Sequence, residues 1–99
     1  MLTKALLVRL EALPGKEAEL AEFLTQARSI VMEEPGTVAW FAIQFGPSTF
    51  GVYDVFPDDE ARDAHLAGGV GQALGPNTGV LFSEPQVEKI DIIADKIPS

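Results

Sequence analysis

Apolar and polar positions along this chain follow two different periods, and each change of period indicates a new element. Leu6, Leu7, Val8 and Leu10 form a short apolar run before the Pro-Gly pair at 14–15, which is typical of a strand and a turn. From residue 16 the apolar positions recur at helical spacing and form one stripe of an amphipathic helix: Leu20, Phe23, Leu24, Ala27, Ile30 and Val31. Proline and glycine at 35 and 36 end this helix, because proline disfavours the α conformation of the residue before it.

A β-hairpin and a second helix are predicted next. Residues 37–45 and 50–56 are rich in β-forming side chains and flank a polar turn at residues 46–49, which is the pattern of an antiparallel hairpin. Residues 57–60 open the second helix, with Asp58 as its N-cap, because a carboxylate there accepts a hydrogen bond from the first helical turn. Glycines at 68 and 69 end the first part of this helix.

The rest of the chain is expected to hold one more helical turn and one strand. Residues 70–74 can form the turn, residues 75–79 are expected to be a loop, and residues 87–94 a closing strand. The order β-α-β-β-α-β predicts an α+β protein with the ferredoxin-like sandwich, in which two helices cover one face of a four-stranded antiparallel sheet. A length of 99 residues predicts a single domain over residues 1–99.

Both faces of the predicted sheet are apolar, although the helices can cover only one of them. Within the hairpin, one face carries Ala39, Phe41, Ile43 and Phe45, and the other carries Val38, Trp40 and Ala42. Soluble monomers rarely expose several aromatic side chains together. We therefore expect a homodimer in which the open face packs on the same face of a second copy. Burial of large apolar side chains at ~1.5–3 kcal/mol each would drive this association.

Composition and charge exclude several classes of function. Lys and Arg number 7 against 15 Asp and Glu, giving a net charge of -8, so neither nucleic acid nor an anionic membrane surface is an expected partner. The absence of cysteine excludes disulfides, thiol nucleophiles and thiolate metal sites, and one histidine argues against zinc or non-haem iron. The first residues lack a signal-peptide pattern and no segment is long enough to span a bilayer, so a cytoplasmic protein is expected.

Several short motifs, taken in order, resemble those of the antibiotic biosynthesis monooxygenase domains, which include small quinol monooxygenases and belong to the dimeric α/β-barrel superfamily. The resemblance covers nearly the whole chain. It depends on four stretches: Pro14-Gly15-Lys16-Glu17, Glu34-Pro35-Gly36-Thr37, Val52-Tyr53-Asp54-Val55-Phe56 with Asp58-Asp59-Glu60-Ala61, and Asp63-Ala64-His65-Leu66. Where the family usually has Tyr-Glu-x-Trp, this chain has Tyr53-Asp54-Val55-Phe56. The phenylalanine in place of tryptophan removes an aromatic N–H donor.

The resemblance implies a homodimer whose back-to-back sheets form a barrel, with an apolar cavity between the sheet and helices of each subunit. It also implies oxidation of small phenolic, quinol or polyketide-like aromatic substrates by O₂, with no cofactor and no metal. The deprotonated substrate would pass an electron to oxygen, and the protein would supply a dry pocket and one base. Relatives that degrade haem have a tryptophan at the place of His65 and an iron-binding histidine near the place of Gly75, so a haem site is not expected.

His65 is the first candidate catalytic residue, because it is the only side chain whose ordinary pKa lies near neutrality. Ala61, Ala64 and Gly68 share its helical face and are small, which leaves room beside it. In the functional interpretation it faces the cavity and accepts a proton from a phenolic substrate. In the alternative it is a hydrogen-bonded, half-buried histidine without a catalytic role.

Tyr53, Trp40, Phe56 and Val8 are candidate substrate-binding residues, since aromatic side chains can stack on an aromatic substrate and Tyr or Trp can also donate a hydrogen bond to it. The alternative is that they belong to the core or to the dimer interface. Asp54 and Arg9 lie in apolar strands and are expected to form an ion pair with each other, within the sheet or across the dimer, with a substrate-anchoring role for Arg9 as a further option.

The glycine-rich residues 69–75 follow a helix rather than a strand, so they do not form a phosphate-binding loop; a hinged lid over the cavity fits them better. No serine lies in a nucleophile-elbow sequence, so hydrolase chemistry has no support. Three functions stay open: a cofactor-independent monooxygenase, a non-catalytic dimeric module that binds a small molecule, and an isomerase or decarboxylase of the same superfamily.

Overall fold

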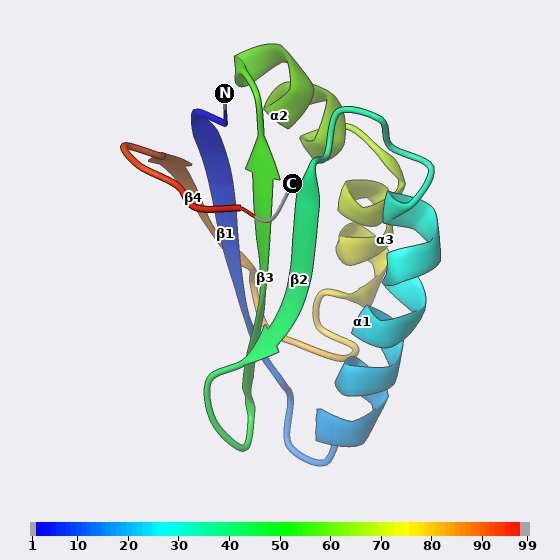
Figure 1. Ribbon diagram of the computed structural model, residues 1–99. Helices are drawn as coiled ribbons and strands as arrows, with labels where there is room; N and C mark the ends of the chain where they lie inside the picture. Colours follow the sequence, from blue (N-terminus) through cyan, green and yellow to red (C-terminus); the bar gives the residue numbers. More distant parts are fainter. Residues whose placement is uncertain (1, 98–99) are drawn as a thin grey trace.

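The computed structural model describes residues 2–97, in which seven elements follow one another. They are β1 (Lys4–Glu11), α1 (Glu17–Val31), β2 (Ala39–Gln44), β3 (Thr49–Phe56), α2 (Asp59–Leu66), α3 (Gly69–Asn77) and β4 (Gln86–Asp91). The strands form one antiparallel sheet in the order β2-β3-β1-β4, and the helices pack on one of its faces (Figure 1). The predicted ferredoxin-like α+β fold is therefore confirmed.

The buried apolar stripe of α1 and the N-cap of α2 are as predicted. Helix α1 buries Leu20, Leu24, Ala27 and Val31 against the sheet, as the apolar stripe indicates, whereas Ile30 at the edge of the stripe is exposed. Asp58 caps α2 by accepting a hydrogen bond of 2.9 Å from the backbone N–H of Ala61.

Helix α3 is longer than predicted and includes part of the expected loop. It continues through Pro76, in its last turn, to Asn77. Asn77 Nδ2 donates to the carbonyl of Ala73 at 2.8 Å, and Thr78 Oγ1 donates to that of Leu74 at 3.0 Å. The backbone N–H of Thr78 also bonds to the carbonyl of Leu74, at 3.1 Å, so backbone and side-chain donors together hold the last turn.

Strand β4 ends at Asp91, three residues before the predicted end. It pairs only with β1, and β1 begins at the residue opposite Asp91. Asp91 is opposite Lys4, the first residue of β1, and after it only the N–H of Ile92 still bonds to the carbonyl of Thr3 at 2.8 Å. The following residues then cross the face of the sheet that the helices leave open (Figure 1). Among the helices of residues 2–97, none has the length and apolar content needed to cross a membrane.

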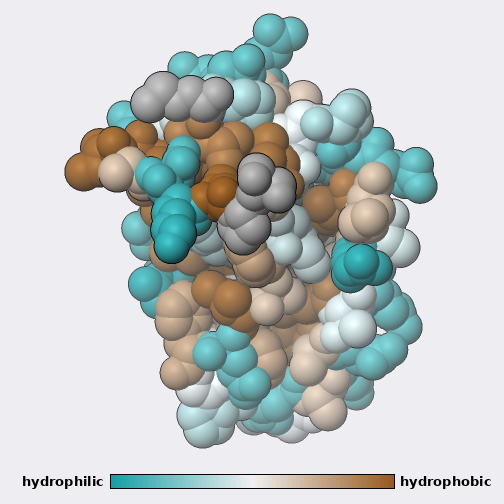
Figure 2. Space-filling view, in the orientation of Figure 1, coloured by the Kyte–Doolittle hydropathy of each residue, from teal (hydrophilic) through white to brown (hydrophobic). Residues whose placement is uncertain are grey.

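The strand register assigns each side chain to a face. Leu6, Val8 and Leu10 of β1 and Phe50, Val52 and Phe56 of β3 face the helices and form the core with Leu20, Leu24 and Phe82. The open face carries a partly exposed apolar patch, which we call the outer patch: Leu7, Phe41, Ile43, Phe45 and Tyr53. Figure 2 shows apolar side chains gathered on this side of the molecule. Ile93 and Ile97, in the segment that follows β4, are exposed as well.

Candidate functional site

Helix α2 holds His65 against the sheet. Arg62, one turn earlier on the same helix, is buried and donates from Nη1 to the carbonyls of Ala5 in β1 and Ile90 in β4, each at 3.2 Å. These bonds fix α2 to two strands, so that His65 lies over β3 with its ring 5.3 Å from the ring of Phe56, measured between centroids. Only 6% of His65 is exposed.

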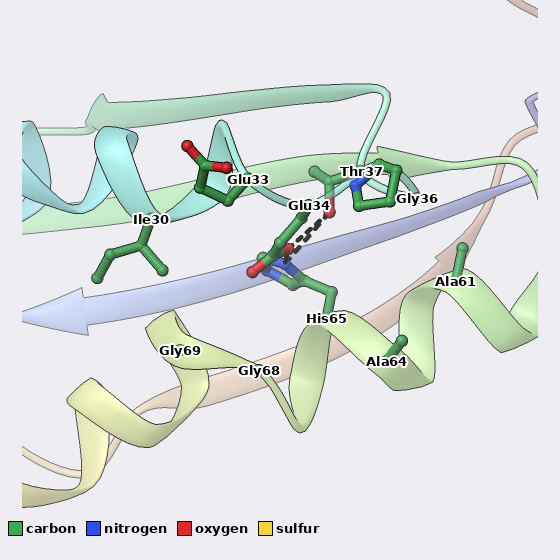
Figure 3. A pocket seen from close by; sticks show the side chains of 11 residues that line it. Ile30, Glu33, Glu34, Gly36, Thr37, Ala61, Ala64, His65, Gly68 and Gly69 are labelled. Atoms are coloured by element: carbon green, nitrogen blue, oxygen red, sulfur yellow. Dashed lines mark hydrogen bonds and ion pairs between the residues drawn. The ribbon is translucent and has the colours of Figure 1, made fainter.

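Both ring nitrogens of His65 contact carboxylates. Nδ1 lies 2.5 Å from Oε1 of Glu34, and Nε2 forms an ion pair with Oδ2 of Asp54. Thr37 Oγ1 donates to the same Oε1 at 2.9 Å and lies 3.4 Å from Nδ1 (Figure 3). An ionised carboxylate can only accept hydrogen bonds, so His65 meets two such partners as the imidazolium. We call Glu34, Asp54 and His65 the histidine cluster.

Three separate segments build the histidine cluster. Asp54 lies on the helix-facing side of β3, directly between Leu6 of β1 and Trp40 of β2. Glu34 lies in the turn after α1, where its backbone N–H bonds to the carbonyl of Val31 at 2.9 Å. Asp54 has no exposed surface, and neither of its carboxylate oxygens makes a hydrogen bond of regular geometry among residues 2–97; Oδ2 has only the close contact with Nε2 of His65. A buried carboxylate oxygen without a donor is unusual and suits a place where a ligand or a proton arrives.

The surroundings raise two pKa values in the cluster. Burial raises the pKa of Asp54, and the contact with His65 only partly opposes this. Burial alone would lower the pKa of His65, but the contacts with Asp54 and Glu34 and their charges together outweigh it, so the pKa of His65 is raised. The pair therefore holds its protons to higher pH than either group would in water. Shifted pKa values of this kind are common at functional sites.

A groove of about 400 Å³ opens beside the cluster, between the turn after α1 and helix α2. This volume lies within the range of small-molecule sites, roughly 300–1,000 Å³. His65 and Glu34 lie between its two ends, as Figure 3 shows, and Glu33 and Thr37 are its other polar lining residues. The remaining lining residues are small or apolar: Ile30, Pro35, Gly36, Ala61, Ala64, Gly68 and Gly69. The small residues that share the helical face of His65 thus lie along this groove.

The space between the sheet and the helices is much smaller than the resemblance implies. The cavity there measures about 30 Å³ and is lined by Asp54, His65 and apolar side chains that include Val8 and Leu74. This is close to the volume that one water molecule occupies in the liquid. The core side chains of α2 and α3 fill the remaining space, so a ligand larger than a few atoms fits the outer groove and not this cavity.

The structure separates the four candidate substrate-binding residues. Val8 borders the inner cavity, and Phe56 is fully buried beneath His65. Trp40 faces the helices and lines a second groove of about 510 Å³ between the end of α1 and β2. Tyr53 is opposite Leu7 and Phe41 on the outer patch, so it cannot reach His65 in the same subunit.

The expected ion pair between Asp54 and Arg9 is wrong. Arg9 lies on the open face, 3.7 Å from Glu88 and 4.5 Å from the ring centroid of Phe45, whereas Asp54 faces the helices and pairs with His65. Their positions in the strands have opposite parity, so the sheet itself separates the two side chains.

Sequence inspection missed Glu34 and Thr37 as site residues. Both belong to the motif at 34–37, and an acid directly before Pro-Gly could have marked a turn that carries a functional carboxylate. The two acids of the cluster bind opposite nitrogens of one ring, so they do not converge on a common point. Within residues 2–97, no group of three or more histidine or acidic side chains is arranged to hold a metal ion.

Solved structures with this fold include two whose names suggest a class. A putative antibiotic biosynthesis monooxygenase from Caulobacter crescentus is 21% identical with a TM-score of 0.76, over 93% of this chain and 91% of that one. Another from Chloroflexus aurantiacus is 18% identical with a TM-score of 0.72, over 95% and 96%. The chain thus shares the fold of these two proteins.

One solved structure is related closely enough to define a family. A protein of unknown function from Nitrosomonas europaea is 51% identical with a TM-score of 0.97, over 100% of this chain and 97% of that one. The chain belongs to the same family as this protein. No protein-family profile and no curated protein sequence matches the chain.

Proposed function

We propose that this protein is a cofactor-independent monooxygenase that oxidises a small phenolic, quinol or polyketide-like aromatic substrate with O₂. The observation that carries the proposal is the buried Asp54–His65 pair, whose second ring nitrogen, in contact with Glu34, lies beside a groove of about 400 Å³. The names of the two monooxygenase-like neighbours point to the same class. Fold alone hosts many functions, so the histidine cluster supplies the specific support.

In this proposal His65 is the proton acceptor and Asp54 is its positioning residue. Asp54 holds the hydrogen on Nε2, which leaves Nδ1 directed at the groove. When Glu34 turns away and His65 is neutral, a phenolic hydroxyl at Nδ1 gives up its proton, and Asp54 stabilises the imidazolium that forms. The substrate then supplies every electron that reduces O₂. One oxygen atom stays on its carbon skeleton and the other leaves as water.

Oxygen uptake with a panel of hydroquinones and hydroxylated aromatic ketones tests this function. We expect uptake above autoxidation with a subset of the panel, with one product formed per O₂. His65→Ala should lower the rate by about a hundredfold or more, since a positioned base contributes ~10²–10⁴. Chelator, catalase and superoxide dismutase control for trace-metal oxidation. Unchanged turnover in the variant would remove His65 from the mechanism, and the absence of uptake with every compound would contradict the class.

We further propose that the protein acts as a homodimer in the cytoplasm, with the outer patches of two copies packed together. The patch holds three aromatic residues at the surface of one subunit, which is more than an isolated soluble chain usually exposes. Ile93, in the segment after β4, is almost fully exposed, and we expect the same contact to cover it. Two sheets packed in this way would form the barrel typical of the superfamily.

The second candidate is a non-catalytic module that binds a small molecule, which the small volume of the inner cavity favours. Such a module would bind aromatic ligands in the groove without consuming O₂. A related isomerase or decarboxylase would convert its substrate at the same rate with and without O₂. Product analysis under nitrogen separates the three functions.

A further inference from the structure

The position that a ligand would need on His65 is already filled by the chain itself. Glu34 Oε1 receives hydrogen bonds from both His65 Nδ1 and Thr37 Oγ1, at 2.5 and 2.9 Å. The other polar contact of Nδ1 within the described residues is with Thr37 Oγ1, at 3.4 Å. A pair of donors directed at one oxygen is a small anion-binding site.

We propose that Glu34 is a displaceable internal ligand and that the groove binds an aromatic oxyanion, whose charged oxygen takes the place of Glu34 Oε1 between His65 and Thr37. This inference rests on the proposed function for the role of the groove and specifies its ligand. A phenolate and an aromatic carboxylate share the required chemistry. The ring of either would lie along the small and apolar residues of the groove.

The burial of the three cluster members shows that Glu34 is the one that can leave. Its side chain is 19% exposed, whereas that of Asp54 is fully buried and that of His65 is 6% exposed. Its backbone belongs to a turn and not to a helix or strand, so the side chain can swing outward without breaking regular structure. Pro35 and Gly36 follow it directly, and Gly36 approaches α2 so closely that an added Cβ would lie 3.1 Å from Ala61 Cβ.

Glu34 is also an incompletely satisfied ligand. Its Oε2 is buried and has no hydrogen-bond partner in the part of the chain that the structure describes. An added Cβ on Gly68 would lie 3.2 Å from this oxygen, so the carboxylate is held against the backbone between α2 and α3. A carboxylate that keeps one oxygen from water without a donor gains by leaving, since in solvent both oxygens are hydrated. A phenolate has only one oxygen that needs hydrogen-bond donors.

The exchange preserves the charge of the cluster. With Glu34 in place, a negative oxygen faces the imidazolium of His65 and Asp54 lies behind it, which is the pattern expected after a phenol has lost its proton. When a neutral phenol enters, its O–H bond breaks and the phenolate oxygen replaces Glu34. The proton leaves to solvent where His65 is already the imidazolium, and passes to Nδ1 where His65 is neutral, as in the proposed function. A carboxylate ligand enters already ionised and releases no proton. Neither step involves a redox change.

Binding of 4-nitrophenol, followed anaerobically by its phenolate absorbance, tests the proposal on the full chain. We compare Glu34→Gln with Glu33→Gln, because Glu33 lines the same groove and its loss changes the charge equally, but it does not contact His65. Removal of the competing carboxylate should tighten phenolate binding about tenfold, or by 1.4 kcal/mol, in Glu34→Gln. Glu33→Gln should change it less than about twofold. Equal or weaker binding in Glu34→Gln overturns the proposal.

Benzoate in the same titration distinguishes the two sources of oxyanion. Displacement of 4-nitrophenolate by benzoate shows that carboxylates share the site, and failure of benzoate to compete restricts the ligand to phenolates. If neither compound binds to wild-type protein or to Glu34→Gln, the groove does not bind aromatic oxyanions and the proposal is wrong.

A measurement on wild-type protein keeps the test independent of variant folding. In ¹³C NMR, saturation with 4-nitrophenol should move the Glu34 carboxyl signal to the position of a solvent-exposed glutamate, while the His65 ring stays protonated. Retention of the Glu34 contact in the complex overturns the proposal. These binding tests contain no O₂, so they are independent of the oxygen-uptake assay. Ligand exchange in the binding tests with no uptake in that assay would contradict only the monooxygenase proposal. Uptake in that assay without ligand exchange would contradict only this inference.

Discussion

Oδ2 of Asp54 contacts Nε2 of His65 at a place where neither residue has appreciable access to solvent. Asp54 lies on a central strand and His65 on the helix that Arg62 fixes to the sheet, so the pair is held by the fold and not by a mobile loop. On the other side of the ring, Glu34 belongs to a turn. The ring of His65 thus has one permanent carboxylate partner and one exchangeable partner, and this asymmetry underlies both proposals.

Replacement of Asp54 by asparagine should lower the pKa of His65, because the buried charge that favours the imidazolium is lost. Oxygen uptake should fall by about a hundredfold or more, as for the loss of a general base. NMR titration measures the pKa directly, since the chain has one histidine. Asp63→Asn on the exposed side of α2 is the matched control and should leave both values unchanged. A pKa of His65 equal in the two variants would contradict the role of Asp54.

Stability should decrease as the pH rises above 6.5, the ordinary pKa of histidine. The raised pKa of His65 means that the folded state binds this proton more tightly than the unfolded state, so its contribution is complete below pH 6.5 and is lost as the pH passes the folded pKa. The raised pKa of Asp54 acts in the same direction from pH 3.8 upward.

Urea denaturation between about pH 6 and pH 9, at constant protein concentration, measures this loss. The variant His65→Gln should lose the part of the decrease that comes from His65, since glutamine does not titrate, and keep only the part that comes from Asp54. A wild-type free energy of unfolding that stays constant or rises over this interval would show that the cluster does not retain its proton.

A charge in the outer patch should dissociate the proposed dimer. Phe41→Glu places a carboxylate within the outer patch and should weaken association by about a hundredfold or more, as for the loss of a large aromatic interface residue. Sedimentation equilibrium over a range of concentrations measures the effect. Val80→Glu is the control, because Val80 has the same exposed fraction of 54% but lies outside the sheet. If the wild-type protein stays monomeric at micromolar concentration, the proposed dimer and its barrel are wrong.

The junction of α2 and α3 should tolerate no side chain at Gly71. An added Cβ would lie 2.3 Å from the backbone oxygen of Leu66, so one helix must shift. We expect Gly71→Ala to reduce the free energy of unfolding by about 1–3 kcal/mol, the usual effect of overpacking. Gly46→Ala, where an added Cβ meets nothing within 4 Å, should change it by less than about 0.5 kcal/mol. Equal urea midpoints for both variants would show that α3 moves freely relative to α2.

Much of the fold could be predicted from local patterns. The apolar stripe that begins at Leu20 predicted α1, the alternation around Trp40 and Phe41 predicted a hairpin with two apolar faces, and Asp58 marked the start of α2. These features depend on residues close together in the sequence, and such short-range preferences can be inferred from the amino-acid sequence alone. The end of α3 was harder to predict, because the side chains of Asn77 and Thr78 add hydrogen bonds to its last turn after Pro76.

The histidine cluster could not be predicted from local patterns. Residue type and position marked His65, but only the packing of α2 on β3 and of the turn after α1 on α2 brings Glu34 and Asp54 to opposite nitrogens of its ring. Strand register likewise decided that Arg9 and Asp54 lie on different faces and that Tyr53 is remote from the groove. Contacts between residues such as Glu34 and His65, 31 positions apart, depend on how whole elements pack together. Periodicity states which side of an element is apolar, whereas tertiary packing alone decides which polar groups are enclosed together.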